Sequence, residues 1–514
     1  MLHSTSVKTR FLVSVSSNGI RAIIGFASGL LIARGLNPSG YGDLMFLLGS
    51  FVAIRSLLDM GTSSAFYTFL SQHSRGRQFY LFYFAWLLLQ FTITLLFIAL
   101  IIPDNIFKRV WLGHNREIVL LAFLAAFMQQ QVWQMVGQIG ESMRKTVMVQ
   151  LLNISIVMAY LAMVSALLVL GGMSVENILY LMIVQYVVAT LWAYRLLRED
   201  QAEFVKTEIT LKQMVGEFWL YCRPMITLSV AGFLYTFVDT WMLQRFGGAS
   251  QQGYFQIAAQ FAQVSLLATI SILNIFWKEI ADALAKADHD RVASLYRKVS
   301  RGLVMLAATI TGFLLPWSEQ TVTIFLGQAY VQAWPVLAIM LLYPIFQSMG
   351  QIGGTMLLAS GQTYKHMVIG TTTMFVAIPV SYFVLAPASG GLISGLGLGA
   401  VGMATKMVLL DMLSVNIQAW VIARYSGWKF DWLYQVIGIP LMIGLGYLAK
   451  TLVGLLWNLD SLGMADLIIP VALALFVYIV AVVLMLWLLP WLIGLEREDI
   501  ERLFERIPIF RMPW

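Results

Sequence analysis

Hydrophobic residues are grouped along this chain in long stretches that polar residues rarely interrupt. A helix needs about 20 mostly apolar residues to cross the hydrocarbon core of a bilayer. Fourteen of these stretches are long and apolar enough to do so. They run approximately over 11–33, 44–70, 80–102, 118–138, 147–170, 177–197, 223–245, 253–276, 302–326, 333–359, 365–386, 400–423, 432–456 and 464–493. They do not alternate apolar and polar residues as barrel strands do. The pattern therefore predicts an all-α polytopic membrane protein of about 14 transmembrane helices.

Composition and charge support this class. Hydrophobic residues make up 59% of the chain and charged residues 11%, against about 25% charged residues in a soluble domain. The single cysteine, Cys222, excludes a disulfide scaffold. With the N-terminus placed in the cytoplasm, 24 of the 33 Lys and Arg residues fall in inner segments and six in outer ones. The positive-inside rule then predicts that both termini are cytoplasmic and explains the net charge of +7 without a nucleic-acid partner.

An internal repeat links the two halves of the chain. The seam between the first two stretches, 34–42, begins with Arg and ends with Gly, and 245–253 does the same at an offset of 211. A weaker echo pairs Gly and Lys of 140–145 with Gly and Lys of 361–365, at an offset near 220. Because six is an even number, a repeated unit of six helices enters the membrane in the same orientation both times. We therefore predict two six-helix lobes in a parallel pseudo-two-fold arrangement, plus a C-terminal helix pair. Such an arrangement places a cavity between the lobes.

The repeat suggests a domain organisation. We predict an N-terminal six-helix lobe (1–200), a cytoplasmic linker helix (201–222), a C-terminal six-helix lobe (223–425), an additional helix pair (426–494) and a cytoplasmic amphipathic tail (495–514). The additional pair either guides a lipid tail or packs against the bundle and partners. No loop is long enough for a catalytic domain, and the five histidines show no metal-ligand spacing. We therefore expect no enzyme activity and no metal.

Several short motifs resemble those of a known family. The first seam reads Arg34-Gly-Leu-Asn-Pro-Ser-Gly-Tyr-Gly42. Further motifs are Asp59-Met60-Gly61, Gly327 with Tyr330, Ala359-Ser360-Gly361 and Gly399-Ala400-Val401-Gly402. In this order the set resembles the bacterial polysaccharide and O-antigen flippases of the multidrug/oligosaccharidyl-lipid/polysaccharide exporter superfamily. The usual residue at position 37 is glycine, and we expect Asn37 to tolerate the same left-handed turn.

The resemblance implies a substrate, a mechanism and a location. The substrate would be lipid-linked oligosaccharide, moved by alternating access across the bacterial cytoplasmic membrane. Polysaccharide polymerase and assembly proteins are the implied partners, besides membrane lipid, and the product would be an O-antigen, a lipopolysaccharide or an exopolysaccharide. In this family the first, second, seventh and eighth spans line the central cavity.

Six ionisable residues lie well inside predicted spans. They are Arg21, Arg55, Asp59, Asp239, Lys406 and Asp411. Each costs about 2.5–3.5 kcal/mol at a helix centre on insertion scales, so such residues normally face a wet cavity or a partner. We predict that Arg21 and Arg55 bind the pyrophosphate, because a guanidinium forms parallel hydrogen bonds to phosphate oxygens and keeps its charge. The alternative for Arg55 is a structural ion pair with Asp59, four residues away on the same helix face.

Other polar groups complete the predicted cavity. Asn18, Gln256, Gln260 and Gln263 are predicted to contact sugar hydroxyls, the alternative for the glutamines being hydrogen bonds between helices. The acids Asp59, Asp239 and Asp411 are candidate coupling sites for H⁺ or Na⁺. Lys406 would add cavity charge, or pair with Asp411 facing the lumen without a transport role. We expect no cofactor beyond a coupling ion.

Three functions remain open from the sequence. The leading hypothesis is a flippase that moves isoprenoid-pyrophosphate-linked oligosaccharide from the inner to the outer leaflet. A cation-coupled multidrug or small-molecule antiporter of the same superfamily would tolerate the same acids but has less need for two buried arginines. A membrane glycan polymerase or ligase would be expected to carry a sizeable periplasmic loop, and every outer loop predicted here is short.

Overall fold

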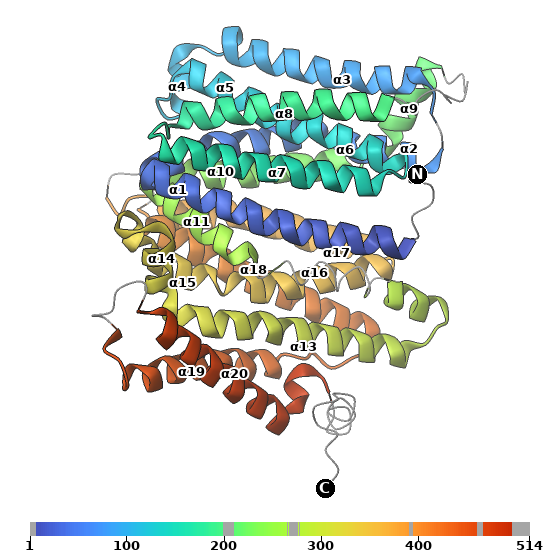
Figure 1. Cartoon of the computed structure of the whole chain (residues 1–514). Coiled ribbons are helices and arrows are strands. Elements are labelled where there is room, and N and C mark those ends of the chain that lie inside the picture. The colour runs from blue at the N-terminus through green and yellow to red at the C-terminus, as the bar shows by residue number, and fades with distance from the viewer. Residues whose placement is uncertain are drawn as a thin grey trace. The chain divides into compact units, whose positions relative to one another are not determined.

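The computed structural model describes residues 7–73, 75–198, 210–264, 266, 276, 278–389, 394–459 and 466–495, and throughout these ranges the regular structure is helical (Figure 1). The helices of the first half are α1 (Val7–Asp59), α2 (Thr62–Gln72), α3 (Arg77–Leu96), α4 (Asp104–Val110), α5 (Arg116–Phe127), α6 (Trp133–Ser142), α7 (Thr146–Val169), α8 (Val175–Arg198), α9 (Leu211–Cys222) and α10 (Met225–Met242). They are followed by α11 (Ala249–Val264), α13 (His289–Leu314), α14 (Ser318–Leu326), α15 (Trp334–Met340), α16 (Tyr343–Ala359), α17 (Thr363–Leu385), α18 (Gly399–Ser426), α19 (Leu433–Gly454) and α20 (Ile468–Leu488). Among the described residues, the π-helical turns η1 (Phe97–Ile101), η2 (Met128–Val132) and η4 (Leu243–Gly247) extend α3, α5 and α10.

The described residues contain twelve helical segments long and apolar enough to cross a membrane. One of them, Val13–Asp59, covers the first predicted stretch and much of the second, because it comprises two helices that meet at a kink at Asn37, where the backbone is not helical. The predicted stretch 253–276 extends beyond α11 into residues outside the described ranges. The all-α multi-pass prediction is confirmed, and the predicted number of 14 helices is approximate.

Contacts divide the chain into two compact units. Unit 1 comprises residues 1–256 and 374–400, and unit 2 comprises 257–373 and 401–514. In unit 1, α1 packs against α7 and α10, and α5 packs against α8. In unit 2, α13 packs against α16 and α19, and α19 packs against α20 (Figure 1). The lobe boundaries expected from the repeat stay a prediction.

The two repeat seams touch each other within unit 1. A Cβ added to Gly42 would lie 1.8 Å from the Ala249 carbonyl oxygen, and one added to Gly253 would lie 2.1 Å from the Pro38 carbonyl oxygen. The two contacts are related by the repeat, because positions 249 and 253 correspond to positions 38 and 42 at the offset of 211. The contact is therefore reciprocal, as a two-fold relation between two copies of one surface requires. Glycine is needed at both positions because each backbone approaches the other too closely for a side chain.

The same offset relates two unusual backbone conformations. Asn37 has φ 58° and ψ 172°, and Gly248, its counterpart in the second seam, has φ 83° and ψ 174°. The expected positive φ at Asn37 is present, but the expected left-handed turn is wrong, because that turn requires ψ near about +47°. The observed region is essentially restricted to glycine and costs other residues about 1–3 kcal/mol. Asn37 is therefore a strained departure from the family motif.

The second echo of the repeat appears at a corrected register. In the turn that ends α6, Met143, Arg144 and Lys145 donate backbone hydrogen bonds to Ile139, Glu141 and Gly140. In the turn that ends α16, Ser360, Gly361 and Gln362 donate to Met356, Leu358 and Leu357. Every donor and acceptor pair is related by an offset of 217, and Arg144 (φ 59°) corresponds to Gly361 (φ 72°). The sequence pattern had instead aligned Gly140 with Gly361, which misses the match between the turns.

The C-terminal helix pair packs onto α13. A Cβ added to Gly446 of α19 would lie 1.8 Å from the Gly312 carbonyl oxygen of α13. Tyr478 of α20 is 1% exposed, and its hydroxyl donates a hydrogen bond of 2.9 Å to the Thr309 carbonyl oxygen. One face of the pair is therefore a packing surface. A role of this pair in guiding a lipid tail stays a prediction.

Within the predicted linker, residues 211–222 form the helix α9. Its first turn has a capping box, in which Thr210 and Gln213 satisfy each other's backbone amides. Phe218 and Cys222 are buried, and Glu217 forms an ion pair of 3.1 Å with the buried Arg75, whose guanidinium lies over the rings of Phe69 and Phe79. The opposite face of α9 is apolar and exposed, as in an interfacial helix. The predicted tail lies, from residue 496 onward, outside the described residues.

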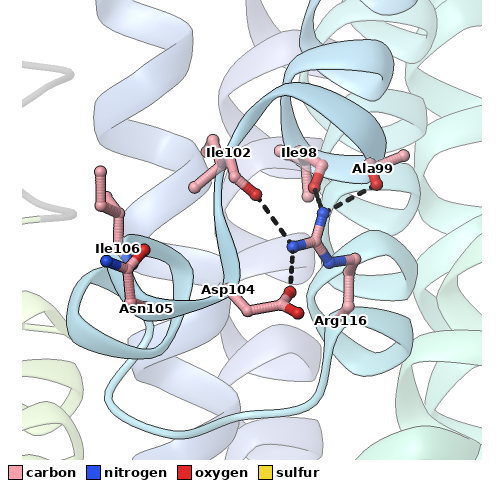
Figure 2. Close-up of polar contacts among 7 residues, drawn as sticks. All are labelled: Ile98, Ala99, Ile102, Asp104, Asn105, Ile106 and Arg116. Atoms are coloured by element: carbon pink, nitrogen blue, oxygen red, sulfur yellow. Dashed lines mark hydrogen bonds and ion pairs between the residues drawn. The ribbon is translucent and has the colours of Figure 1, made fainter.

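One arginine closes the loop between α3 and α5 (Figure 2). Arg116 donates to the carbonyl oxygens of Ile98, Ala99 and Ile102 at 2.7–3.0 Å and to Asp104 Oδ1 at 2.6 Å. These carbonyls end the α3–η1 helix and have no partner further along it. A cation at a helix C-terminus is also favoured by the helix dipole. Arg116 therefore fixes the end of this span.

Candidate functional site

The fourth predicted span carries a row of glutamines that connects the helices of unit 1. Gln130, Gln134 and Gln138 are spaced by four residues, and η2 contains the first of them. Within the row, Gln134 Oε1 accepts a hydrogen bond from Arg55 Nη2, and Gln138 Nε2 donates to the Ser63 carbonyl oxygen at 3.2 Å. Beside the row, Gln131 Nε2 donates to Gln90 Oε1 at 3.3 Å, and Gln129 Nε2 donates to the hydroxyl of Tyr186 at 3.1 Å. A π-turn inside a helix frequently marks a functional site. We treat this polar cluster as the centre of the candidate site.

Arg55 lies inside this cluster. Its guanidinium donates to the neutral amide of Gln134 on α6 and borders a cavity of about 20 Å³ lined by Phe51, Phe123 and Phe127. This volume is about that of one water molecule. Pyrophosphate therefore does not fit beside Arg55 while the guanidinium is bound to Gln134.

Asp59 does not form the alternative ion pair with Arg55. Its Oδ1 accepts from Ser63 N at 2.8 Å and from Thr62 Oγ1 at 3.0 Å, and its Oδ2 accepts from Ser63 Oγ at 2.8 Å. The chain turns sharply between α1 and α2, where Gly61 has φ 87°. Asp59 thus caps the first turn of α2, the role of a capping carboxylate. The Asp59-Met60-Gly61 motif therefore has a structural reason.

Arg21 is half-buried. It lies on α1, with its Nη1 3.5 Å from Asn18 Oδ1, and it interacts electrostatically with Tyr186 and Glu141. Glu141 follows Gln134 by seven residues on α6, so the two positions share one face and lie about 10 Å apart along the axis. Arg55 is thus hydrogen-bonded to α6, and the charge of Glu141, on the same face of that helix, acts on Arg21.

Asp239 is enclosed within unit 1. It lies on α10, is 5% exposed, and accepts a hydrogen bond from the hydroxyl of Ser381 on α17. A buried carboxylate needs such partners, because burial of an unpaired charge is costly. The position combines a buried acid with a hydroxyl oxygen, which is the chemistry of a proton or Na⁺ site.

Unit 2 holds the remaining predicted charges. Lys406 is 3% exposed, and Oδ2 of Asp411 is buried with no hydrogen-bond partner among the described residues. The Oε1 atoms of Gln347 and Gln351 on α16 are likewise buried and have no hydrogen-bond partner among the described residues. These glutamines correspond to Gln130 and Gln134 at the offset of 217 that relates the two turns. The repeat thus places a glutamine row on both the fourth and the tenth predicted span.

The predicted sugar contacts are less enclosed. Gln256 and Gln260 are half-buried, whereas Asn18 and Gln263 are exposed. On α11, the helix of these glutamines, Gln251 Oε1 accepts from Ala400 N at 2.8 Å, which caps α18. This contact gives the Gly399-to-Gly402 motif a structural role.

The glutamine rows are the part of the site that the sequence analysis missed. The signal was present as three consecutive glutamines, Gln129 to Gln131, and as a four-residue spacing inside an apolar stretch. Because these side chains are neutral, a search for misplaced charge passes over them.

Comparisons with known proteins agree with this architecture. A family model described as "Polysaccharide biosynthesis protein" matches residues 7–276, just over half of the chain. The chain therefore belongs to this family of multi-pass membrane proteins. No curated protein sequence matches it.

Solved structures define the fold. The structure titled "Lipid II flippase MurJ, inward closed conformation" has a TM-score of 0.67 and 13% identity, covering 92% of this chain and 98% of that one. A MOP superfamily transporter from Pyrococcus furiosus has a TM-score of 0.53 and 14% identity, over 83% and 99% of the two chains. An outward-facing multidrug resistance MATE family transporter of the MOP superfamily has a TM-score of 0.51 and 13% identity, over 82% and 95%. The chain therefore has the fold of MOP superfamily transporters, as the sequence motifs predicted.

Proposed function

We propose that this protein is a flippase that moves isoprenoid-pyrophosphate-linked oligosaccharide from the inner to the outer leaflet of the bacterial cytoplasmic membrane by alternating access. Membership of the polysaccharide biosynthesis family supports the substrate class. The fold that it shares with a lipid II flippase over 92% of its length supports the type of transport. The proposed product is a repeat unit of an O-antigen, a lipopolysaccharide or another exported polysaccharide.

The observation that carries the proposal is the pair of arginines inside the predicted spans of α1, one of which is hydrogen-bonded to α6. Arg21 and Arg55 both lie inside predicted spans, where each cation is costly. Arg55 is bound to the neutral Gln134. Pyrophosphate carries negative charge that the neutral Gln134 lacks and can accept two parallel hydrogen bonds from a guanidinium, so it would displace this glutamine. The small cavity beside Arg55 then requires that the helices separate when substrate binds, which is what alternating access provides.

The other predicted groups have subordinate roles in this proposal. Asn18, Gln256, Gln260 and Gln263 contact sugar hydroxyls. Asp239 and Asp411 are the sites for a coupling H⁺ or Na⁺, and Lys406 adds positive charge. The coupling role does not extend to Asp59, since its carboxylate oxygens cap α2.

The test replaces the arginines in cells that lack their native copy of the protein. Arg21→Ala and Arg55→Ala are each expected to lower the rate of surface glycan export by about 10- to 100-fold, because hydrogen bonds to charged groups contribute about 1.5–3 kcal/mol. Lipid-linked oligosaccharide should accumulate in the inner leaflet. Arg109→Ala, at an exposed position of α4, is the control and should export glycan normally. Normal export by both span variants, at normal protein levels, would contradict the proposal.

A cation-coupled multidrug antiporter is the second candidate, and the buried Asp239 with its Ser381 partner favours it. This function predicts that Asp239→Asn abolishes drug resistance conferred by the protein while the arginine variants retain it. Glycan export that fails in the arginine variants, with unchanged drug resistance, favours the flippase instead.

A further inference from the structure

Unit 2 contains a cavity at the junction of α13, α16, α18 and α19, formed by residues other than those of the polar cluster around α6. Its volume is about 210 Å³, and it lies among the first turns of α13, the last turns of α18 and the loop that leads into α19. Pockets for drug-sized ligands begin at about 300 Å³, so this cavity is smaller than such a pocket. It is nevertheless far larger than the space that one water molecule needs. It is the size of a lipid headgroup or a small phosphate compound.

The lining of this cavity has an excess of positive charge. Arg301 is fixed by Asp431, with Nε and Nη2 each 2.8 Å from a carboxylate oxygen, and it also donates to the Trp491 carbonyl oxygen. Arg297 and Lys429 line the same cavity and are exposed at its rim. Neither of these two side chains makes a hydrogen bond or an ion pair with any residue in the described ranges. One cation is thus neutralised by the acid, and two are left to meet an anion.

The remaining walls are aromatic and apolar. The rings of Tyr296 and Trp428 lie 5.8 Å apart and form one side, and Met349 and Ala419 line the apolar part. A cationic rim beside an apolar wall fits an amphiphile with a phosphate head, because Lys and Arg neutralise the phosphate while the glycerol and first methylenes contact the wall. Basic pockets between transmembrane helices on the cytoplasmic side bind anionic lipid headgroups in this way. The sequence places these residues in segments predicted to face the cytoplasm.

We propose that this cavity binds a phosphate group, carried either by an anionic membrane lipid or by a small soluble phosphate compound, with Arg297 and Lys429 as its ligands. The fixed Arg301–Asp431 pair forms the back of the site and holds α13 against the α18–α19 loop. Occupancy would strengthen the same junction, since the two ligands come from α13 and from that loop. The proposal is independent of the transported substrate and of the arginines in α1.

The experiment measures lipid retention by the purified full-length protein. Protein in mixed micelles of detergent with phosphatidylglycerol or phosphatidylcholine is analysed by native mass spectrometry, and glycerol 3-phosphate is added in a separate arm. Wild-type protein should retain phosphatidylglycerol in preference to phosphatidylcholine. Arg297→Gln/Lys429→Gln should lower that preference by about 30-fold, which follows from about 1 kcal/mol for each basic residue near anionic lipid and about 1.4 kcal/mol per tenfold change. Both side chains are exposed, so the variant should fold normally.

A matched variant separates a site from general attraction. Arg77→Gln/Arg223→Gln removes two exposed arginines of unit 1 and should keep the wild-type preference. Displacement of phosphatidylglycerol by glycerol 3-phosphate identifies the soluble compound as the ligand, and retention identifies the lipid. Equal losses in the two double variants, or no loss in Arg297→Gln/Lys429→Gln, would overturn the proposal.

Discussion

The contact between the two repeat seams makes a sharp prediction about Gly42 and Gly253. Gly42→Ala places a Cβ 1.8 Å from the Ala249 carbonyl oxygen, far inside the 3.4 Å at which ordinary van der Waals contact begins. The obstacle is backbone, so no side-chain rotation relieves it, and the two helices must move apart. Overpacking usually costs about 1–3 kcal/mol, and the rigid neighbour places this substitution at the upper end, about 3 kcal/mol.

Gly253→Ala meets the Pro38 carbonyl oxygen at 2.1 Å and should cost about as much. Because one separation of the helices relieves both clashes, the double variant should be less destabilised than the sum of the two single variants. If the two substitutions acted independently, their losses of stability would add. Non-additivity of this sign therefore tests whether the two seams meet at one crossing.

The assay is thermal unfolding of the purified protein, together with glycan export in cells. Gly370→Ala is the control, since a Cβ at this position of α17 meets nothing within 4 Å and replaces glycine in a helix. It should be as stable as the wild type or slightly more so. Wild-type unfolding temperatures and normal glycan export in both Gly42→Ala and Gly253→Ala would refute a close contact between the seams.

Three further predictions concern single side chains. Asn37→Gly should stabilise the protein by about 1–3 kcal/mol in the same unfolding assay, because glycine adopts the observed φ and ψ without strain, and a lower stability would contradict the strain. Arg116→Ala should destabilise it by about 2–3 kcal/mol, because helix-end carbonyls lose their donor, whereas Arg109→Ala should leave stability unchanged. Burial lowers the pKa of His114, but hydrogen bonds to Asp43 and to the Trp111 carbonyl outweigh it and raise the pKa above the usual 6.5. The wild type should therefore exceed His114→Gln in stability below about pH 6.5, and the difference should shrink as pH rises through the raised pKa; a difference that grows with pH would refute this assignment.

Most of the span positions followed from hydrophobic length alone. A lipid-crossing helix must satisfy its backbone internally, so a long apolar stretch leaves little choice of structure. The interruptions were harder to predict. The kink of α1 at Asn37 falls between the first two predicted stretches, but the break at Gly61 falls inside a stretch predicted as one span. Local backbone conformation at such points depends on close neighbours, such as Met225 against Gly61, which belong to distant parts of the sequence.

In the candidate site, too, some features follow from the sequence and others depend on distant neighbours. The cost of charge in a membrane singled out Arg21 and Arg55 from the sequence, and the structure shows Arg55 hydrogen-bonded to Gln134 of α6. The four-residue rule that suggested an Arg55–Asp59 pair assumes that nothing else competes for the carboxylate. Here the turn into α2 leaves amides that Asp59 caps, and a backbone amide at a helix start is a closer partner than a flexible guanidinium. The neutral Gln134, and not Asp59, then accepts the hydrogen bond from Arg55.

The repeat preserves the scaffold of the two halves but not their charges. Backbone hydrogen bonds of the turns after α6 and α16 match at an offset of 217, and glutamines recur at the same offset. At the offset of 211, however, Arg21 corresponds to Gly232, and Asp239 corresponds to Ser28. A duplicated gene segment initially carries the same charges in both copies, so this asymmetry arose after the fold was set. Under the proposed function, the phosphate would bind at Arg21 and Arg55 of the first repeat and the coupling ion at Asp239 of the second, so the two ligands would not compete for one site.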